Sequence, residues 1–244
     1  MAAEKALGKH ANSGLEGITW VPEERAFYVL NQEKPTILLK LDVPLGKKDG
    51  GKAEVLSVLG ELYWEVRVGD KVDVVVDTPN SGVALAVNQV TRQKGKAFLV
   101  SGAASADLTG KACSPNTIHW TYDTWMLANG TGSAIVKTGG DSWFFLTADY
   151  AFGHALERDT EAVVVKGGGK VLGKVRHPLN AQDFSSFLLQ AQASKAEILG
   201  LANAGGDTIN SIKAANEFGI TKNQSLAGLL VFITDIHSLG LNTA

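Results

Sequence analysis

The sequence is poor in cysteine and has no long apolar run. Cys113 is the only cysteine among 244 residues, so an intrachain disulfide is excluded and the redox compartment stays open. No uncharged apolar run reaches the ~18 residues that a membrane span requires. Residues 1–17 lack the apolar core of a signal peptide, so we expect no export signal in this sequence.

An excess of charge of either sign is also missing. Lysine and arginine number 23 against 25 aspartate and glutamate, which gives a formal net charge of -2. Such a balance provides no general electrostatic attraction to nucleic acid or to an anionic membrane, so neither is an expected partner. Because 45% of the residues are hydrophobic, the chain can bury a sizeable core in one large domain or two small ones.

Most signatures of catalysis are absent. The sequence holds no G-x-S-x-G elbow, no Walker lysine loop and no H-E-x-x-H motif. The five histidines lack the spacing of metal ligands, so no metal site is predicted. Glu157 and Glu161 lie four residues apart on a predicted helix, and we interpret them as solvated surface rather than as an acid/base pair. We expect no enzymatic activity and no cofactor.

A repeated βαβα pattern begins at Val72. Short, nearly continuous apolar runs predict strands covered on both faces, and they alternate with segments whose apolar residues recur at helical spacing. Parallel strands need such crossovers, so we predict a doubly wound sheet or part of a β/α barrel. Residues 102–121 break the rhythm and are interpreted as a passage between two lobes. The predicted strands are 72–76, 97–100, 142–146, 170–176, 196–201 and 226–233.

The first 66 residues differ in kind from the rest. Residues 14–20, 26–30 and 36–41 have the pattern of short strands separated by turns, and 43–52 is polar and rich in glycine, as in a loop. These features predict a β-meander without helical crossovers. We place a boundary near residues 67–70.

Polar residues follow the predicted strands at their carboxyl ends. Since these ends meet at one edge of a parallel sheet, we expect the polar groups to converge there. Helix starts would direct free backbone N–H groups at a carboxylate, and aspartates would pair with an ammonium group, a combination that suits a zwitterion. The alternative is that these residues are plain helix N-caps. The helix starts are Ser81, Ser105 and Thr208, and the aspartates are Asp149, Asp207 and Asp235.

An aromatic group lies near the end of the irregular interval. It comprises His119, Trp120, Tyr122 and Trp125, just before a predicted helix. Core packing is one interpretation of such residues. The other is an aromatic wall between two lobes, because aromatic side chains with a few polar groups are typical of sites for small molecules.

Five segments resemble the substrate-binding proteins of branched-chain amino acid type ABC transporters, which have the periplasmic-binding-protein type I fold. The resemblance runs from about residue 70 to residue 244 and includes the subgroup that serves amino acids, amides, urea and aromatic acids. The segments are VDVVVDTPNSGVALAVNQV (72–90), FLVSGAASADLTGKACSPNTIHWTYDTW (98–125), WFFLTADYAFG (143–153), DFSSFLLQAQASKAEILGLANAGGDTINSIKAANEFGI (183–220) and GLLVFITDIHSLGL (228–241).

The resemblance implies an α/β fold of doubly wound parallel sheets in two lobes. These lobes would close over an amino acid, amide or small carboxylate and deliver it, chemically unchanged, to an ABC permease from the periplasm. The ligand contacts that it implies are Asn80, Ser81, Ala103, Ala104 and Ser105 in the first lobe, Thr121 and Asp123 near the crossover, and Tyr150, Phe152, Asn203, Gly205, Asp207, Phe232, Thr234 and Asp235 in the second lobe.

Two departures from the family pattern concern the ends of the chain. The family's opening portion of the first lobe is missing, and residues 13–42 instead resemble the opening blade of SdiA-regulated, phytase-like β-propeller proteins; one blade cannot close a propeller. The chain also stops before the family's second lobe is complete. We therefore expect an incomplete fold with a β-rich segment of different origin at 1–66, a partial first lobe at 67–121 and a partial second lobe at 122–244.

Two alternatives stay open beside the binding role. The first is a truncated or chimeric fragment without a ligand, which forms homo-oligomers through its open sheet edges. The second is a doubly wound enzyme in which Asp149, with His154 or His237, acts as acid and base.

Overall fold

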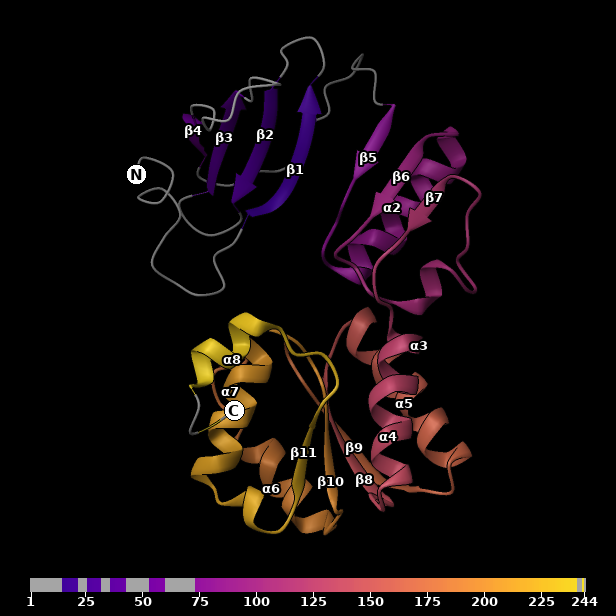
Figure 1. Cartoon of the computed structure of the whole chain (residues 1–244), viewed down its shortest axis with the longest axis vertical. Coiled ribbons are helices and arrows are strands. Elements are labelled where there is room, and N and C mark those ends of the chain that lie inside the picture. Colours follow the sequence, from indigo (N-terminus) through magenta and orange to yellow (C-terminus); the bar gives the residue numbers. More distant parts are fainter. Residues whose placement is uncertain are drawn as a thin grey trace.

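The computed structural model describes residues 15–21, 26–31, 36–42, 53–59, 73–240 and 243. These residues form three separate sheets, one antiparallel and two parallel, and helices pack on the parallel ones (Figure 1). Within the described ranges, no helix combines the length and the apolar character needed to cross a membrane.

The amino-terminal sheet is an antiparallel meander. It consists of β1 (Leu15–Val21), β2 (Ala26–Asn31), β3 (Thr36–Asp42) and β4 (Ala53–Leu59), paired in chain order. The prediction of three short strands is confirmed, and β4 adds a fourth that the sequence analysis missed. β1 lies beside β5 but forms no ladder with it (Figure 1). The predicted boundary at residues 66 and 67 lies outside the described residues.

The first parallel sheet has the order β5-β6-β7. Its strands are β5 (Val74–Val76), β6 (Ala97–Val100) and β7 (Thr117–His119), and α2 (Ser81–Lys94) connects the first two. The prediction missed β7, because a strand of three residues is too short to show a period. The 3-10 turn η1 (Ala106–Leu108) follows β6.

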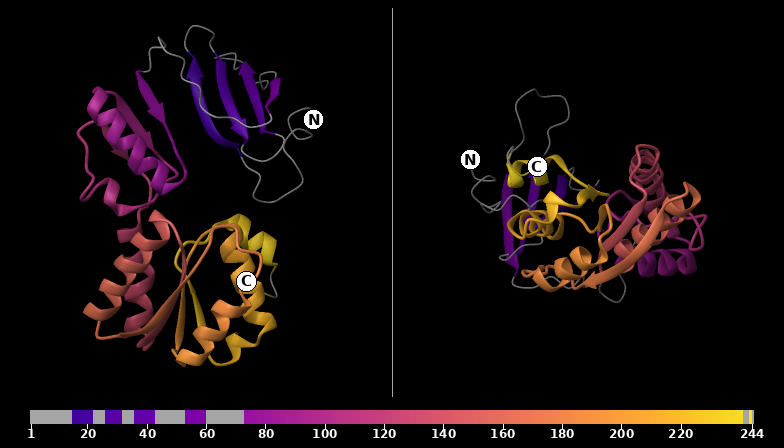
Figure 2. Two further views of the ribbon diagram at one scale, coloured as in Figure 1. Left: turned by 180° about the vertical axis from the view of Figure 1, so that it is seen from behind. Right: turned by 90° about the horizontal axis from the view of Figure 1, so that it is seen from below.

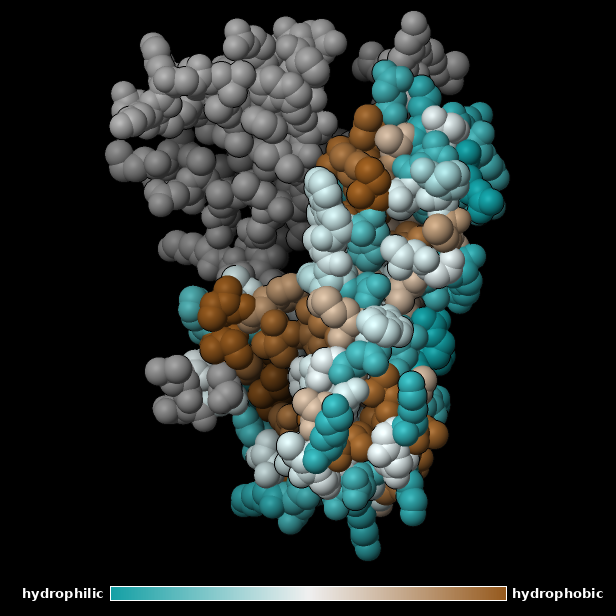
Figure 3. Space-filling model, turned by 45° about the vertical axis from the view of Figure 1, so that its right-hand side comes forward, coloured by the Kyte–Doolittle hydropathy of each residue, from teal (hydrophilic) through white to brown (hydrophobic). Residues whose placement is uncertain are grey.

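Among the described residues, those of α2 and η1 cover one face of the first parallel sheet. Phe98 and Val100 are fully buried in a cluster with Ala84 of α2 and Leu108 of η1. The alternate residues point to the opposite face, where Val74, Val76 and Ile118 keep 49%, 37% and 52% of their surface exposed. Hydrophobic residues accordingly reach the surface in several separate places (Figure 3).

The second parallel sheet has the order β11-β10-β8-β9. Its strands are β8 (Ser142–Ala148), β9 (Lys170–His177), β10 (Ile198–Ala202) and β11 (Ser225–Gly228), all parallel. The helices that follow these strands are α5 (Ala151–Lys166), α6 (Ser185–Ser194), α7 (Gly206–Glu217) and α8 (Ile233–Leu239).

Strand β8 supplies the core on both faces of this sheet. Trp143 and Phe145 point into the cluster on the α5 side, whereas Phe144 and Leu146 point into the cluster with α6 and α7. Helices therefore lie on both faces (Figures 1 and 2). This arrangement confirms the predicted α/β class with doubly wound parallel sheets.

One helical stretch leads from the first sheet to the second. It begins as α3 (Thr124–Leu127), widens into the π-helical segment η2 (Ala128–Gly132) and ends as α4 (Ser133–Lys137). A side chain at Gly132 would lie 3.3 Å from the methyl group of Thr160 on α5, so a glycine allows the two helices to approach closely.

Two predictions about the second sheet are wrong in part. The strand predicted at 226–233 ends at Gly228, and α8 begins at Ile233. Glu157, interpreted as solvated surface, is only 3% exposed, and its Oε1 lies 3.1 Å from Nζ of Lys174 on β9. The period of α5 places Glu157 toward the sheet edge, where a neighbouring strand can supply a cation.

Gly153 sits where α5 begins directly against the end of β8. A Cβ atom at this position would collide with the carbonyl oxygen of Ala148 and lie 3.1 Å from that of Ala202. We expect Gly153→Ala to lower the free energy of unfolding by about 2–3 kcal/mol, because backbone atoms must move to make room. Urea denaturation measures this change.

Gly130→Ala is the matched control, since nothing lies within 4 Å of a Cβ atom at Gly130 and the residue also lies in a helical stretch. This substitution should raise stability by about 0.5–1 kcal/mol. Equal effects of the two substitutions would contradict the close approach at Gly153.

Candidate functional site

The loop after β8 brings aromatic side chains to the carboxyl edge of the second sheet. Tyr150 occupies the N-cap position of α5 without a side-chain capping bond, so its ring is free for other contacts. The rings of Tyr150 and Phe152 have centroids 5.8 Å apart. Phe152 is buried in the core cluster, whereas Tyr150 packs against that cluster and stays partly exposed.

Asp207 holds the loop between β9 and α6. Its two carboxylate oxygens accept hydrogen bonds from the backbone N–H groups of Asn180, at 3.1 Å, and Ala181, at 3.0 Å. Asn180 has a positive φ of 58°, so the carboxylate stabilises a backbone conformation that is unfavourable for most residues. The side chain of Asp207 is therefore a structural anchor as well as a charge.

Asn203 lies at the centre of a buried polar cluster beside this anchor. Its Oδ1 accepts a hydrogen bond of 2.8 Å from the hydroxyl of Thr208, and its Nδ2 lies 3.4 Å from Oγ of Ser211 and 3.3 Å from Nε2 of His177. All four side chains are fully buried. The sequence analysis named Thr208 only as a helix start and did not name Ser211 and His177 as site residues, because only contacts in space group these side chains. The predicted start is wrong by two residues, since α7 begins at Gly206.

Burial and charge act together on Asp207 and Tyr150. Burial raises the pKa of the Asp207 carboxyl, and the hydrogen bond from Asn180, the charge of His177 and the hydrogen bond from Ala181 offset part of this rise. The pKa of Tyr150 is raised by burial first, then by the charges of Asp207 and Tyr122. Tyr150 is therefore a neutral hydrogen-bonding group at the edge of the sheet.

The loops of the first sheet form a compact hydrogen-bonded unit. Asn80 caps α2, since its Oδ1 accepts from the N–H groups of Gly82 and Val83. The hydroxyl of Ser81 accepts from the N–H of Ser105 at 3.2 Å, and the hydroxyl of Ser105 accepts from the N–H of Asp107. Side chains that are fully buried in this unit belong to Ser81, Ala103, Ala104 and Ser105.

The crossover places Tyr122 against the second sheet. Tyr122 packs against the core cluster on the α5 side and makes an edge contact with Phe232, with ring centroids 6.3 Å apart. Thr121 donates to the carbonyl oxygen of Ser101, and Asp123 caps α3 through the N–H of Met126. The aromatic group separates accordingly: Trp120 and Trp125 are exposed, and Tyr122 alone joins the site.

The start of α8 supplies one exposed ring and one buried carboxylate. Phe232 is 39% exposed, and Thr234 is exposed as well. Asp235 is fully buried, and its Oδ2 accepts from the N–H of Phe232 at 2.9 Å. Among the described residues, the other oxygen of Asp235 has no hydrogen-bond partner, so this carboxylate has an unused acceptor.

Most of these positions fall into two groups. The rings of Tyr150 and Phe152 lie side by side and Phe232 meets Tyr122, whereas Asn80, Ser105 and Asp123 serve as caps of helical segments. Gly205 takes the N-cap position of α7 with φ 57° and ψ -128°, a conformation that favours glycine. The capping roles are the alternative that the sequence left open, and a role in ligand binding stays a prediction for all of these residues.

The pair proposed for acid/base chemistry lies outside this group. Nε2 of His154 is 2.7 Å from Oδ1 of Asp149, and Arg176 lies 3.9 Å from the same oxygen. Both partners of the pair are well exposed, and His237 is exposed on α8. An exposed, charge-compensated pair is typical of a surface interaction.

The comparisons with known proteins agree with the fold. Residues 63–244 match the family described as periplasmic binding protein. Over 163 residues, the chain is 26% identical to Leu/Ile/Val-binding protein homolog 6 of Brucella melitensis, an alignment that covers 65% of this chain and 41% of that protein.

Two solved structures are similar to the chain. A periplasmic binding protein from Burkholderia mallei shares 62% identity at a TM-score of 0.71. A branched chain amino acid ABC transporter periplasmic ligand-binding protein from Burkholderia xenovorans LB400 shares 35% identity at a TM-score of 0.60. Each comparison covers 74% of this chain and 48% of the other, so the chain spans about half the length of these relatives.

The raised pKa of Asp207 predicts a dependence of stability on pH. A carboxyl whose pKa is higher in the folded state binds its proton more readily there, so its contribution is lost as pH rises from about 4 through the folded pKa. Asp207→Asn cannot ionise. The difference in the free energy of unfolding, wild type minus variant, should therefore decrease over this range in urea denaturation at stepped pH.

Asp183→Asn provides the opposite case. Hydrogen bonds from Ser185 lower the pKa of the Asp183 carboxyl, so the stability that it contributes is lost as pH falls. The corresponding difference for this variant should increase with pH. A difference for Asp207→Asn that stays constant, or that follows the Asp183 trend, would contradict the assignment.

Proposed function

Because the chain belongs to the periplasmic binding protein family, we propose that it binds a small solute without changing it chemically and presents it to an ABC permease in the periplasm. The solute class that we propose is an amino acid, an amide or a small carboxylate. The names of the relatives from Brucella melitensis and Burkholderia xenovorans support an amino acid within this class.

The observation that carries the proposal is the contact between two aromatic rings from different segments, those of Tyr122 and Phe232. Tyr122 reaches from the crossover to Phe232 at the start of α8, and the charge of Asp207 acts on Tyr150. Tyr122 and Tyr150 remain partly exposed although they pack against the core, and Phe232 is 39% exposed. Aromatic walls with a few polar groups are the usual lining of sites for small molecules.

Each end of a zwitterionic solute has a candidate partner. Asn80, Ser81 and Ser105 would receive the acidic end beside the start of α2, where the helix dipole favours negative charge. Asp207 and Asp235 are the candidates for the amino end. Asp235 retains an unused acceptor oxygen, whereas both oxygens of Asp207 already accept backbone N–H groups.

A second function follows from the exposed apolar face of the first sheet. Val74, Val76 and Ile118 are exposed on one face of this sheet. Parallel sheets normally have both faces covered. A structural role without a solute, with association of chains through this face, is the alternative. Light scattering that shows a mass rising with concentration, together with no solute response, would favour it.

A thermal-shift panel of amino acids, amides and aromatic acids tests the binding role. A solute at about 100 times its dissociation constant should add roughly 2.7 kcal/mol to the free energy of unfolding, which is a clear rise in melting temperature. The absence of a rise for every member at millimolar concentration would contradict the proposal.

Tyr150→Ala then tests the placement of the solute. We expect its dissociation constant for a solute found in the panel to rise at least tenfold in calorimetry, because the ring supplies contact area. Phe218→Ala is the control, since Phe218 is an exposed aromatic residue at the far end of α7. Equal affinities of the two variants would place the solute elsewhere.

A further inference from the structure

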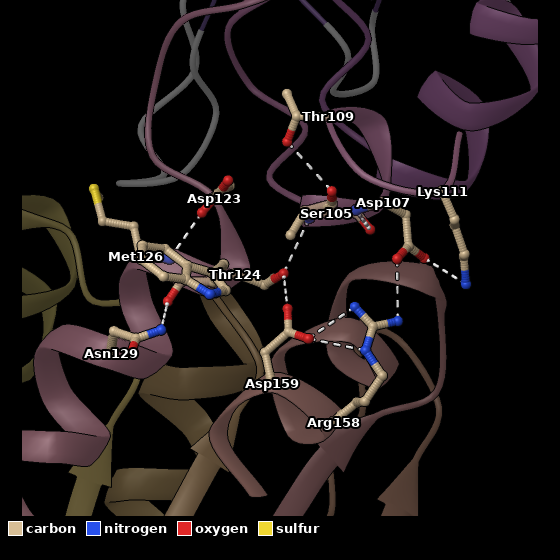
Figure 4. Close-up of polar contacts among 12 residues, drawn as sticks. Ser105, Asp107, Thr109, Lys111, Asp123, Thr124, Met126, Asn129, Arg158 and Asp159 are labelled. Carbon is tan, nitrogen blue, oxygen red and sulfur yellow. Dashed lines mark hydrogen bonds and ion pairs between the residues drawn. The ribbon is translucent and has the colours of Figure 1, made fainter. Parts of the chain in front are cut away.

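A cluster of charged side chains joins the first parallel sheet to the second (Figure 4). Asp107 belongs to η1, which follows β6 of the first sheet, and Lys111 lies one turn further along the same loop. Arg158 and Asp159 lie in the middle of α5, which packs on β8 of the second sheet. The cluster therefore connects the loop after β6 to the helix that packs on β8, near Ala104, which belongs to the core cluster on the α5 side.

Arg158 bridges two carboxylates of different origin. Its Nη1 lies 3.1 Å from Oδ1 of Asp107, and its Nη2 and Nε each lie 2.8 Å from Oδ1 of Asp159. The planar guanidinium offers several donors in fixed directions, which makes such a bridge directional. Lys111 pairs with the other oxygen of Asp107 at 2.9 Å, but this pair stays within one loop.

Thr124 forms a second connection from α5 to the first sheet. Its hydroxyl donates to Oδ2 of Asp159 at 2.6 Å and accepts from the backbone N–H of Ala106 at 3.0 Å. Its own N–H donates to the carbonyl oxygen of Ala104 at 2.8 Å. Thr124 is fully buried, so one hydroxyl links α5 to the loop of residues 103–106 without competition from water.

The surroundings make these bonds stronger than an ordinary surface pair. The side chains of Asp107 and Asp159 are only 14% exposed, and that of Arg158 is 48% exposed. Burial lowers the pKa of the Arg158 guanidinium. The hydrogen bond to Asp159, the charge of Asp159 and the charge of Asp107 raise it by more, so the pKa is raised overall. Without Arg158, two mostly buried carboxylates would lose the cation between them.

We propose that Arg158 and Asp159 are positioning residues that set the angle between the two parallel sheets and hold the loop of residues 103–106 in place. This loop contains Ala103, Ala104 and Ser105, so an effect on solute binding rests on the proposed function. The positioning of the sheets and of the loop does not rest on the proposed function.

Spin labels measure the angle directly. Cys113 is exposed and is the only cysteine, so it takes one nitroxide label on the first-sheet side. Glu217→Cys, at the exposed end of α7, takes the second label.

In the full chain, Arg158→Met should shift or broaden the distribution of distances between the two labels, measured by pulsed electron paramagnetic resonance. Lys111→Met removes the same charge beside Asp107 but cuts no link between the sheets, so it should leave the distribution unchanged. Identical distributions for the two variants would overturn the proposal.

Hydrogen exchange tests the loop independently of any solute. Thr124→Val keeps the shape of the side chain but removes the hydroxyl, so the amide of Ala106 should exchange about tenfold faster. Thr124→Ser keeps the hydroxyl and should restore slow exchange, which separates the hydrogen bond from packing. An Ala106 amide that exchanges equally in both variants would overturn the role of the Thr124 hydroxyl in holding the loop of residues 103–106.

Calorimetry with L-leucine and with benzoate adds the link to binding. If wild type binds either probe, Thr124→Val should weaken it about tenfold, which corresponds to roughly 1.4 kcal/mol, and Thr124→Ser should bind within about twofold of wild type. If wild type binds neither probe, the proposed function is weakened for those two solutes, and the spin-label and exchange results still decide the positioning roles.

Discussion

The burial of β8 on both faces is the constraint on which the second half of the molecule depends. Trp143 and Phe145 on one face, and Phe144 and Leu146 on the other, can only be removed from water if helices cover both sides of the strand. Helices therefore cover the carboxyl end of β8 on both faces, and the chain can leave this strand only at the carboxyl edge of the sheet. The loop that carries Tyr150 starts there, so the core determines where this loop leaves the sheet.

Several of the side chains at the strand ends of the two parallel sheets have a structural task. Asp207 anchors a loop with a strained residue, Asn180, and the hydroxyl of Ser105 caps a 3-10 turn. A side chain that is already held by its own hydrogen bonds loses little conformational entropy when a ligand arrives. A side chain that caps a helix can therefore also contact a ligand, so the two interpretations of these residues in the sequence do not exclude each other.

The sequence predicted the parts of the fold that depend on local pattern. Strands β6, β8 and β9 appear where apolar runs predicted strands, but of these three β8 alone is buried on both faces, since β9 alternates between exposed and half-buried residues before His177. The strand-end argument located the loops around Tyr150 and Asp207. β7 is too short for a pattern, and the apolar run after Gly228 continues past the end of its strand because Leu229 and Leu230 are buried as loop residues. The burial of Glu157 depends on Lys174, a strand neighbour that no helical period reveals.

The cluster of charged side chains between the two parallel sheets could not be predicted from the sequence pattern. Arg158 and Asp159 are adjacent polar residues on a helix, a feature that sequence alone assigns to solvent. Their partners are Asp107, on the loop after β6, and Thr124, the first residue of α3, so the network joins segments that are far apart in the sequence. Gly132 also allows the crossover helix to approach α5 closely. Tyr122 is a second residue whose role only contacts in space reveal. Its neighbours Trp120 and Trp125 are exposed, whereas its own ring contacts Phe232.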